Sequence, residues 1–308
     1  MNDELAIAVK GMTKSFGSHK AVNNVDLQVR AGEICGFLGP NGSGKTTFIR
    51  MLCGLLRPDS GSGKCLGYDV IAQSEAIKLQ VGYMTQRFSF YEDLSIYENL
   101  DFVARMYSMN NRTQAVKEAI DRLGLEKRQH QLAGELSGGW KQRMALAACM
   151  IHKPRLLLLD EPTAGVDPKA RREFWEEIHR LAGEGLTFLI ATHYMDEAER
   201  CHRLAFILNG NLLTQGTVEE VIAQSQLATW SVSGPDLHRL LAQIREAPGV
   251  EQAVVFGNTL HVSGPNPDAL AQAIAEFRSG AHEWSRINPG LEDVFIHLIE
   301  GAKNGLSR

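Results

Sequence analysis

The nine residues GPNGSGKTT at positions 39–47 set the architecture expected of the whole chain. They match the pattern G-x-x-x-x-G-K-[ST], with Gly39, Gly44, Lys45 and Thr46 at the fixed positions. The preceding EICGFL has the pattern of a short buried strand, and the following TFIRMLCGLL has that of a helix. A strand, a glycine-rich loop and a helix in this order are the context of a phosphate-binding loop.

The chemistry of this loop predicts a bound nucleotide. Glycines let the backbone wrap around phosphates, so that its N–H groups and the helix N-terminus face the anion. We expect Lys45 to reach the β- and γ-phosphates and the Thr46 hydroxyl to bind Mg²⁺. A glycine-rich turn with a chance lysine is the alternative, and the flanking strand and helix argue against it. The expected nucleotide-binding residues here are Gly39, Pro40, Asn41, Gly42, Ser43, Gly44, Lys45, Thr46 and Thr47.

Length and composition limit the remaining possibilities. The 308 residues suggest one large domain, alone or with a small second one. A hydrophobic content of 44% and a charged content of 22% are typical of a soluble globular protein. The net charge of -4 argues against nucleic acid as a partner. The five scattered cysteines are typical of small core residues in a reducing compartment.

The chain has neither a secretion signal pattern at its start nor a window of 18 uncharged apolar residues, so we expect no direct membrane span. Any membrane role is therefore expected to come through a partner.

The residues before the phosphate loop predict a β region. LAIAVKGM at 5–12 alternates like a strand, and the sequence up to residue 33 continues as a hairpin-like region with turn signals. Phe16 lies in this region. It has two interpretations that its spacing leaves open: an aromatic ring that stacks on adenine, or an ordinary residue of an edge strand.

A helical insertion is expected at about residues 87–154. It follows the strand VGYMTQ, which ends at Gln86. Ser95 and Glu98 form the pattern of a capping box, which predicts a helix start. Later in the insertion, ELSGGWKQR predicts a long helix capped by Ser137. Because a helix N-terminus presents free N–H groups and a positive partial charge, Ser137, Gly138 and Gly139 are candidates for a second phosphate site. A simple helix cap is the alternative.

Two more buried strands end in candidate catalytic groups. The run RLLLLDEP predicts a strand buried on both faces of a parallel sheet, ending in Asp160 and Glu161. We expect Asp160 to hold Mg²⁺ opposite Thr46 and Glu161 to polarise an attacking water. LTFLIATH predicts a strand ending in His193, which we interpret as a phosphate contact rather than as a structural histidine.

The remaining sequence predicts a hairpin and a second module. Asn209-Gly210 is a hairpin turn signal, and the helix TVEEVIAQS closes the first domain near Gln226. The pattern after it is βαββαβ, which predicts a ferredoxin-like α+β module at 227–308. This module shows packing patterns and no catalytic cluster, so a docking or dimerising domain is the expectation.

Taken together, these motifs resemble those of the ATP-binding cassette (ABC) ATPases of ABC transporters, in the order that the family has them. The resemblance covers about residues 5–225. It implies a P-loop NTPase α/β core with an antiparallel β subdomain and an inserted helical subdomain, so that residues 1–226 form the ATP-binding domain. Each matched residue receives the role of its motif. These residues are Phe16 for adenine stacking, Lys45 in the Walker A motif, Gln86 in the Q-loop that touches Mg²⁺, Ser137 in the signature, Asp160 and Glu161 in the Walker B motif, Asp167 in the D-loop and His193 as the switch histidine.

The resemblance also implies how such a protein works. Each ATP lies between the Walker A motif of one subunit and the signature of another, so a homodimer or a pair of cassettes is expected. The assembly drives a separate transmembrane permease, from a peripheral position on the cytoplasmic face of the bacterial inner membrane. Trp140 departs from the family pattern, which usually has glutamine there. An indole suits a subunit interface better than a phosphate contact.

The segments NPGLEDVFIHLI and YMTQRFSFYEDLSIYENL are similar to those of the daunorubicin-resistance and YbhF-like export branch, which implies export of drugs or other amphipathic compounds. Two other function classes compete with transport. One is an ABC-type ATPase acting on ribosomes or DNA, which usually has two cassettes or long coiled coils. The other is a regulator that binds nucleotide without hydrolysing it, and the presence of Glu161 and His193 argues against this.

Overall fold

The computed structural model describes residues 4–278 and 280–305. Residues 1–3, 279 and 306–308 of the two expected domains lie outside this description. The chain divides into two compact units, Met1–Thr214 and Gln215–Arg308. The division comes earlier than residue 226, because the helix α8 (Val218–Ser225) packs against α11 (Leu291–Gly305) of the second unit.

A six-stranded sheet forms the centre of the first unit. Its order is β10-β9-β3-β8-β7-β6. The bounds are β3 (Ile34–Leu38), β6 (Val81–Met84), β7 (Leu156–Asp160), β8 (Thr187–Thr192), β9 (Arg203–Leu208) and β10 (Asn211–Gly216). The pairs from β9 to β6 are parallel. Every residue of β3, β7 and β8 is buried, as expected for uninterrupted apolar strands in a parallel sheet. Parallel strands bring their carboxyl ends to one edge, where ligands bind in such sheets.

A second, antiparallel sheet has the order β2-β1-β4-β5. Its strands are β1 (Leu5–Phe16), β2 (His19–Arg30), β4 (Ser60–Cys65) and β5 (Tyr68–Asp69). Helix α1 (Lys45–Leu52) buries Phe48, Ile49, Met51 and Leu52 in a core shared with both sheets. The Phe37 and Phe48 rings stack at 4.9 Å between centroids. Strand β3 and helix α1 are thereby held on either side of the phosphate loop.

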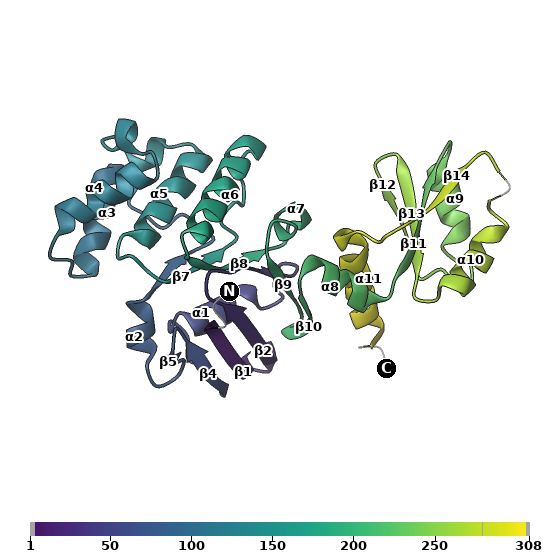
Figure 1. The fold of residues 1–308 in the computed structure, drawn as a ribbon, viewed down its shortest axis with the longest axis horizontal. Helices are drawn as coiled ribbons and strands as arrows, with labels where there is room; N and C mark the ends of the chain where they lie inside the picture. The colour runs from purple at the N-terminus through teal and green to yellow at the C-terminus, as the bar shows by residue number, and fades with distance from the viewer. Residues whose placement is uncertain (1–3, 279, 306–308) are drawn as a thin grey trace. The chain divides into compact units, whose positions relative to one another are not determined.

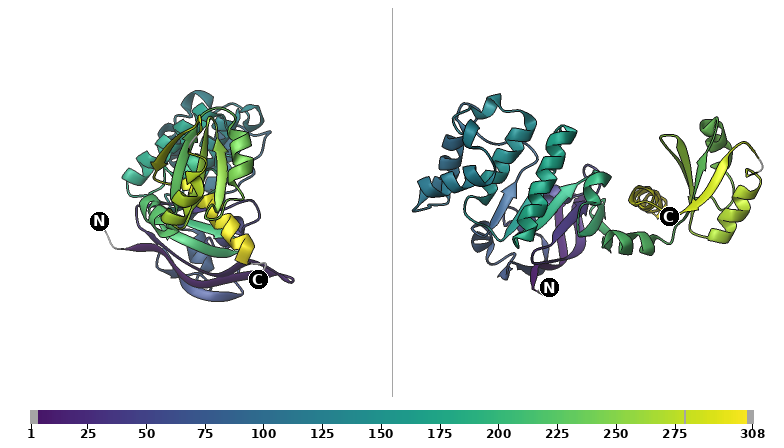
Figure 2. Two further views of the ribbon diagram at one scale, coloured as in Figure 1. Left: turned by 90° about the vertical axis from the view of Figure 1, so that its right-hand side faces the viewer. Right: turned by 45° about the horizontal axis from the view of Figure 1, so that its top comes forward.

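The helices of the insertion gather at the end of the unit away from β1 and β2 (Figures 1 and 2). They are α3 (Ile96–Met106), α4 (Arg112–Arg122), η1 (Glu126–Arg128), η2 (Ala133–Glu135) and α5 (Gly138–Met150). The predicted capping box is present, since the Glu98 N–H donates to Ser95 Oγ at 3.2 Å and the Ser95 N–H donates to Glu98 Oε2 at 2.8 Å. The remaining helices of the unit are α2 (Ser74–Lys78), α6 (Pro168–Gly183) and α7 (Met195–Ala198). The α/β core with its antiparallel sheet and inserted helices follows the expectation.

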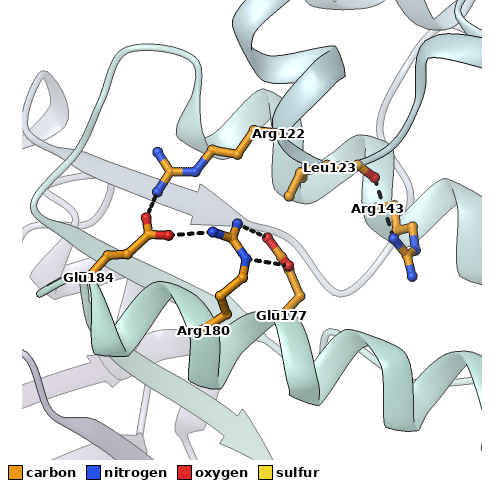
Figure 3. Close-up of polar contacts among 6 residues, drawn as sticks. All are labelled: Arg122, Leu123, Arg143, Glu177, Arg180 and Glu184. Atoms are coloured by element: carbon orange, nitrogen blue, oxygen red, sulfur yellow. Dashed lines mark hydrogen bonds and ion pairs between the residues drawn. The ribbon is translucent and has the colours of Figure 1, made fainter.

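Polar side chains join the insertion to α6, as Figure 3 shows. Arg122 of α4 contacts Glu184, which also contacts Arg180. Arg143 of α5 donates to the carbonyl of Leu123 at 3.4 Å and to Glu173 Oε2 of α6 at 3.0 Å. Since exposed ion pairs each contribute only about 0–1 kcal/mol, these contacts orient the insertion more than they stabilise it.

Among its described residues, 215–278 and 280–305, the second unit contains α8, a four-stranded sheet and three further helices. The sheet order is β12-β13-β11-β14, with β11 (Ala228–Ser233), β12 (Gln252–Phe256), β13 (Thr259–Gly264) and β14 (Glu283–Ile287), and all three pairs are antiparallel. Helices α9 (Leu237–Ile244) and α10 (Pro267–Ala275) cover one face, and α11 lies on the other side (Figures 1 and 2). On the α11 side, His261 Nδ1 lies 3.0 Å from the buried Asp293 carboxylate. Within the described ranges of the whole chain, no helix is long and apolar enough to cross a membrane.

Candidate functional site

The phosphate loop lines a cleft of about 210 Å³ at the carboxyl edge of the parallel sheet. Its lining residues are Ala21, Asn41, Gly42, Gly44, Lys45, Thr46, Thr47, Gln86 and Glu161. Gly44 has a φ of 106°, and a Cβ there would lie 2.2 Å from the carbonyl oxygen of Ala21. A side chain at position 44 is therefore excluded by both the conformation and β2. Ala21 is the lining residue that the motif analysis missed, because nothing in the sequence predicts which part of β2 meets the loop.

Three predicted site residues converge on the carboxylate of Glu161, which is 7% exposed. Gln86 Nε2 donates to Glu161 Oε2 at 2.8 Å. Lys45 Nζ lies 3.3 Å from Glu161 Oε1, and His193 Nδ1 lies 3.3 Å from the same oxygen. These residues come from the loop after β3 and from the ends of β6, β7 and β8. Strand β8 lies between β3, which precedes the phosphate loop, and β7, which ends just before Glu161. His193 follows β8 and therefore lies between these two segments.

Lys45 is buried, and its ammonium group donates to the carbonyl oxygens of Gly39 at 2.8 Å and Pro40 at 3.1 Å. Burial lowers the pKa of Lys45, and the neighbouring Glu161 and Asp160 carboxylates act in the opposite direction. Ser43 is also buried, and its N–H donates to the Pro40 carbonyl at 3.2 Å, which closes the loop. The ammonium group is thus held at the cleft beside Thr46.

Glu161 has an unusual backbone conformation. Its φ is 49°, in the left-handed region, which costs a residue other than glycine about 1–3 kcal/mol. Its N–H donates to the Ala191 carbonyl of β8 at 2.9 Å, so the turn after β7 is held by the neighbouring strand. Strain of this kind collects at active sites, where the surrounding structure enforces it. The conformation aims the carboxylate at Lys45 and Gln86 instead of along the strand.

The residues beside Glu161 fit a magnesium ion. Asp160 Oδ1 is buried and has no hydrogen-bond partner among the described residues. Burial raises the pKa of Asp160, while a hydrogen bond from the Thr46 side chain lowers it. The described chain contains no cluster of three or more His, Cys, Asp or Glu suited to a metal. Mg²⁺ does not need one, because it binds through one or two carboxylates and completes its coordination with waters and phosphate oxygens.

The signature residues lie elsewhere in the chain. Ser137 is exposed at the N-terminus of α5, and its side chain makes no capping hydrogen bond. Gly139 packs against α6, since a Cβ there would lie 2.6 Å from Cβ of Ala170. None of Ser137, Gly138 and Gly139 is among the described residues that line the cleft. The structure therefore brings Lys45, Gln86, Glu161 and His193 together and leaves the signature outside the lining of its own cleft.

Phe16 and Asp167 also lie outside the cleft lining. Phe16 ends β1 with 53% of its surface exposed, and Lys14 Nζ lies 5.9 Å from its ring centroid. Asp167 caps α6 by accepting hydrogen bonds from the N–H groups of Lys169 at 3.1 Å and Ala170 at 3.0 Å. The sequence Asp-Pro at the start of a helix could have predicted this cap.

Trp140 stacks on two arginines of its own chain. The guanidinium carbon of Arg128 lies 4.7 Å from the ring centroid and that of Arg143 lies 5.5 Å from it. The indole therefore links η1 to α5 within the helical insertion. Trp140 and Arg143 are three residues apart on one helix, so their spacing is compatible with this contact, whereas nothing in the sequence predicts the contact with Arg128 of η1.

We expect Trp140→Gln to destabilise the chain by about 1 kcal/mol, because cation–π contacts at exposed sites are worth roughly 0.5–1 kcal/mol each. ATP hydrolysis should be largely retained, since backbone N–H groups and Ser137 dominate a helix N-terminus. Denaturant unfolding and steady-state ATPase assays measure the two effects. Trp140→Phe is the control, because it keeps an aromatic face for both arginines. Complete loss of hydrolysis in a folded Trp140→Gln chain would show that the indole takes part in the site.

The chain is similar to a known protein family and to several known proteins. The ABC transporter family matches residues 22–164. The probable multidrug ABC transporter ATP-binding protein YbhF of Escherichia coli (strain K12) is 38% identical over 98% of this chain and 53% of its own length. The Nod factor export ATP-binding protein I of Rhizobium sp. (strain N33) is 36% identical over 96% of this chain and 97% of its own length. The daunorubicin resistance ATP-binding protein DrrA3 of Streptomyces coeruleorubidus is 33% identical over 96% of both chains. This chain thus spans about half of YbhF and nearly all of the other two.

Solved structures are similar to part of the chain. A crystal structure of the ADP conformation of an ATP-binding cassette of an ABC transporter is 26% identical, with a TM-score of 0.63, over 70% of this chain and 92% of that chain. A dimeric structure of a post-hydrolysis cassette bound to ADP and Pi has a TM-score of 0.62 at 24% identity, over 68% of this chain and 98% of that chain. The second likeness concerns the fold alone.

Proposed function

We propose that this chain is the hydrolysing subunit of an exporter. The chain belongs to the ABC transporter ATP-binding proteins and is therefore an ATPase. The observation that carries the proposal is the convergence of Lys45, Gln86 and His193 on the Glu161 carboxylate. A site that only binds nucleotide needs the phosphate loop, whereas hydrolysis needs a base next to the γ-phosphate.

The predicted site residues have the following parts in this proposal. The N–H groups of residues 39–47 and the Lys45 ammonium hold the β- and γ-phosphates, and Phe16 stacks on the adenine. Thr46, Asp160 and Gln86 hold Mg²⁺, which neutralises phosphate charge when bound. Glu161 takes the proton of the attacking water, and His193 contacts the γ-phosphate.

We infer that two chains complete each site. A γ-phosphate held by Lys45 has a face left for the N-terminus of a second helix, and Ser137 with its two glycines offers such a terminus to another molecule. Asp167 is also exposed, and it caps the N-terminus of α6. A homodimer or a pair of related cassettes, with two composite ATP sites, satisfies this arrangement.

The exported compounds and the partner are inferred from the relatives. Their names specify multidrug transport, Nod factor export and daunorubicin resistance, so we propose drugs or other amphipathic compounds as cargo. Export requires a separate transmembrane permease, which would place this chain on the cytoplasmic face of the inner membrane. We further propose that residues 227–308 form a ferredoxin-like docking or dimerising module, which their strand order β12-β13-β11-β14 supports.

An apolar surface next to the Gln86 segment suits the permease. Tyr91 and Phe102 pack edge to face at 5.2 Å between centroids, with 53% and 40% of their surfaces exposed. Met106, further along α3, is 70% exposed. Exposed apolar groups that cluster in this way mark interaction sites. Because Gln86 reaches Glu161 from the same segment, docking here would connect the permease to the catalytic carboxylate.

We expect the full chain to bind native membranes of its own cells and not protein-free liposomes made of the same lipids. Met106→Lys should abolish this binding, because it places a charge in the apolar surface. Leu213→Lys is the matched control, since Leu213 is also exposed. It lies on β10, the edge strand opposite to β6, whereas the helix α3 follows β6 in the chain. Sedimentation with each membrane measures the binding. Equally tight binding to protein-free liposomes would contradict the proposed partner.

A further inference from the structure

A buried carboxylate outside the cleft connects the loop after Glu161 to the strand before His193. Glu197, in the short helix α7, is 1% exposed. It accepts a hydrogen bond from the Thr192 hydroxyl at 2.6 Å and another from the Thr163 hydroxyl. Both threonines are 1% exposed. A buried carboxylate is stable only when its oxygens are hydrogen-bonded or paired, so these bonds hold the group in place.

The two threonines are close in sequence to the two catalytic candidates. Thr163 follows Glu161 by two residues, and Thr192 immediately precedes His193. Thr192 Oγ1 also accepts a hydrogen bond from the Tyr194 N–H at 3.1 Å, so the backbone on both sides of His193 is fixed. The chain of bonds from Tyr194 through Thr192 to Glu197 is charge-assisted, and such bonds are shorter and stronger than neutral ones.

Arg171 extends the cluster to α6 and to the imidazole. Its Nε lies 3.8 Å from Glu197 Oε1, and its guanidinium carbon lies 4.5 Å from the Tyr194 ring centroid. The Tyr194 ring in turn lies 4.1 Å from the His193 ring, centroid to centroid. The helix that Asp167 caps is thereby connected to the residues around His193.

We propose that Glu197 is a positioning residue for ATP hydrolysis, which fixes Glu161 and His193 relative to each other by binding Thr163 and Thr192 on one carboxylate. The inference rests on the proposed roles of Glu161 and His193. A carboxylate only accepts hydrogen bonds, so both hydroxyls must donate to it. A glutamine would turn an N–H group toward one of them, and that hydroxyl would have to give up its present bond. The position of the attached segment would then relax.

The experiment compares Glu197→Gln, Thr163→Val and Thr192→Val with the conservative variants Thr163→Ser and Thr192→Ser, all in the full chain. We expect kcat to fall on the order of 10²-fold in the first three variants, since small misplacements of catalytic groups have effects of this size. The affinity for ATP, measured by equilibrium titration, and KM should stay near wild type, because Lys45 and the loop are untouched. The serine variants keep the hydroxyl and should retain most of the kcat.

A double-mutant comparison separates positioning from general damage. In a chain carrying His193→Ala, adding Glu197→Gln should lower the single-turnover rate less than it does alone, because one of the two groups that Glu197 positions is gone. The inference is overturned if kcat and ATP affinity fall together, if the serine variants are as slow as the valine variants, or if the two losses in rate multiply. If Glu161→Gln itself still turns over, the proposed site is wrong. If Glu161→Gln is inactive while Glu197→Gln and Thr163→Val are wild type, only the role of Glu197 is wrong.

Discussion

A chain carrying Glu161→Gln is expected to lose ATP turnover by about 10²–10⁴-fold, which is the usual contribution of a general base. It should keep its affinity for ATP, because Lys45, Thr46 and the loop N–H groups hold the phosphates. The substitution also removes the negative charge 3.3 Å from Lys45 Nζ, so ATP affinity is expected to hold or rise. Steady-state hydrolysis and equilibrium binding of ATP measure the two effects.

The same variant should form a dimer that depends on ATP, because bound ATP persists between two chains when it is not hydrolysed. Size-exclusion chromatography with and without ATP and Mg²⁺ tests this. Glu75→Gln is the control, since it removes an exposed carboxylate that pairs with Lys78 three residues away. Hydrolysis near the wild-type rate would show that Glu161 is not the base. A monomer at saturating ATP would count against a site shared by two chains.

Ser137→Arg is expected to abolish turnover, although the residue lies outside the cleft of its own chain. A bulky cationic side chain would fill the space that the proposed arrangement reserves for the γ-phosphate of the partner. The fold should not suffer, because Ser137 is exposed and its side chain makes no capping bond. A steady-state ATPase assay measures the loss of turnover, and the melting temperature shows whether the fold is intact.

Ser137→Ala is the matched control for this substitution. It removes the hydroxyl without adding bulk, so hydrolysis should fall far less than in Ser137→Arg. Turnover near wild type in a folded Ser137→Arg chain would show that the N-terminus of α5 does not approach nucleotide.

Much of the fold could be predicted because the strongest signals are local. The apolar run at 156–159 has the composition of a strand buried on both faces, and Ser95 with Glu98 forms both halves of a capping box. The membership of the chain in the ABC transporter family was predicted from motif order and is confirmed by the relatives. No helix is predicted at α2, because its five residues are too few to show a helical period.

The residues that sequence reasoning missed depend on packing between distant segments. Glu197 lies in a stretch of acidic residues that is typical of an exposed helix, and only tertiary structure buries it between Thr163 and Thr192. Likewise, Trp140 contacts Arg128 only because the fold of the insertion brings the two residues together. The roles of Phe16 and Ser137 stay predictions, because each lies outside the cleft and needs a ligand or a second chain.

We propose that each ATP is hydrolysed between Lys45 of one chain and Ser137 of another. A mixture of two inactive variants tests this arrangement. In a heterodimer of Lys45→Ala and Ser137→Arg chains, one composite site carries both defects and the other carries none. Single-turnover hydrolysis by differently tagged chains, purified together, should therefore be restored although each variant alone is inactive. A tagged heterodimer as inactive as its two components would contradict the claim.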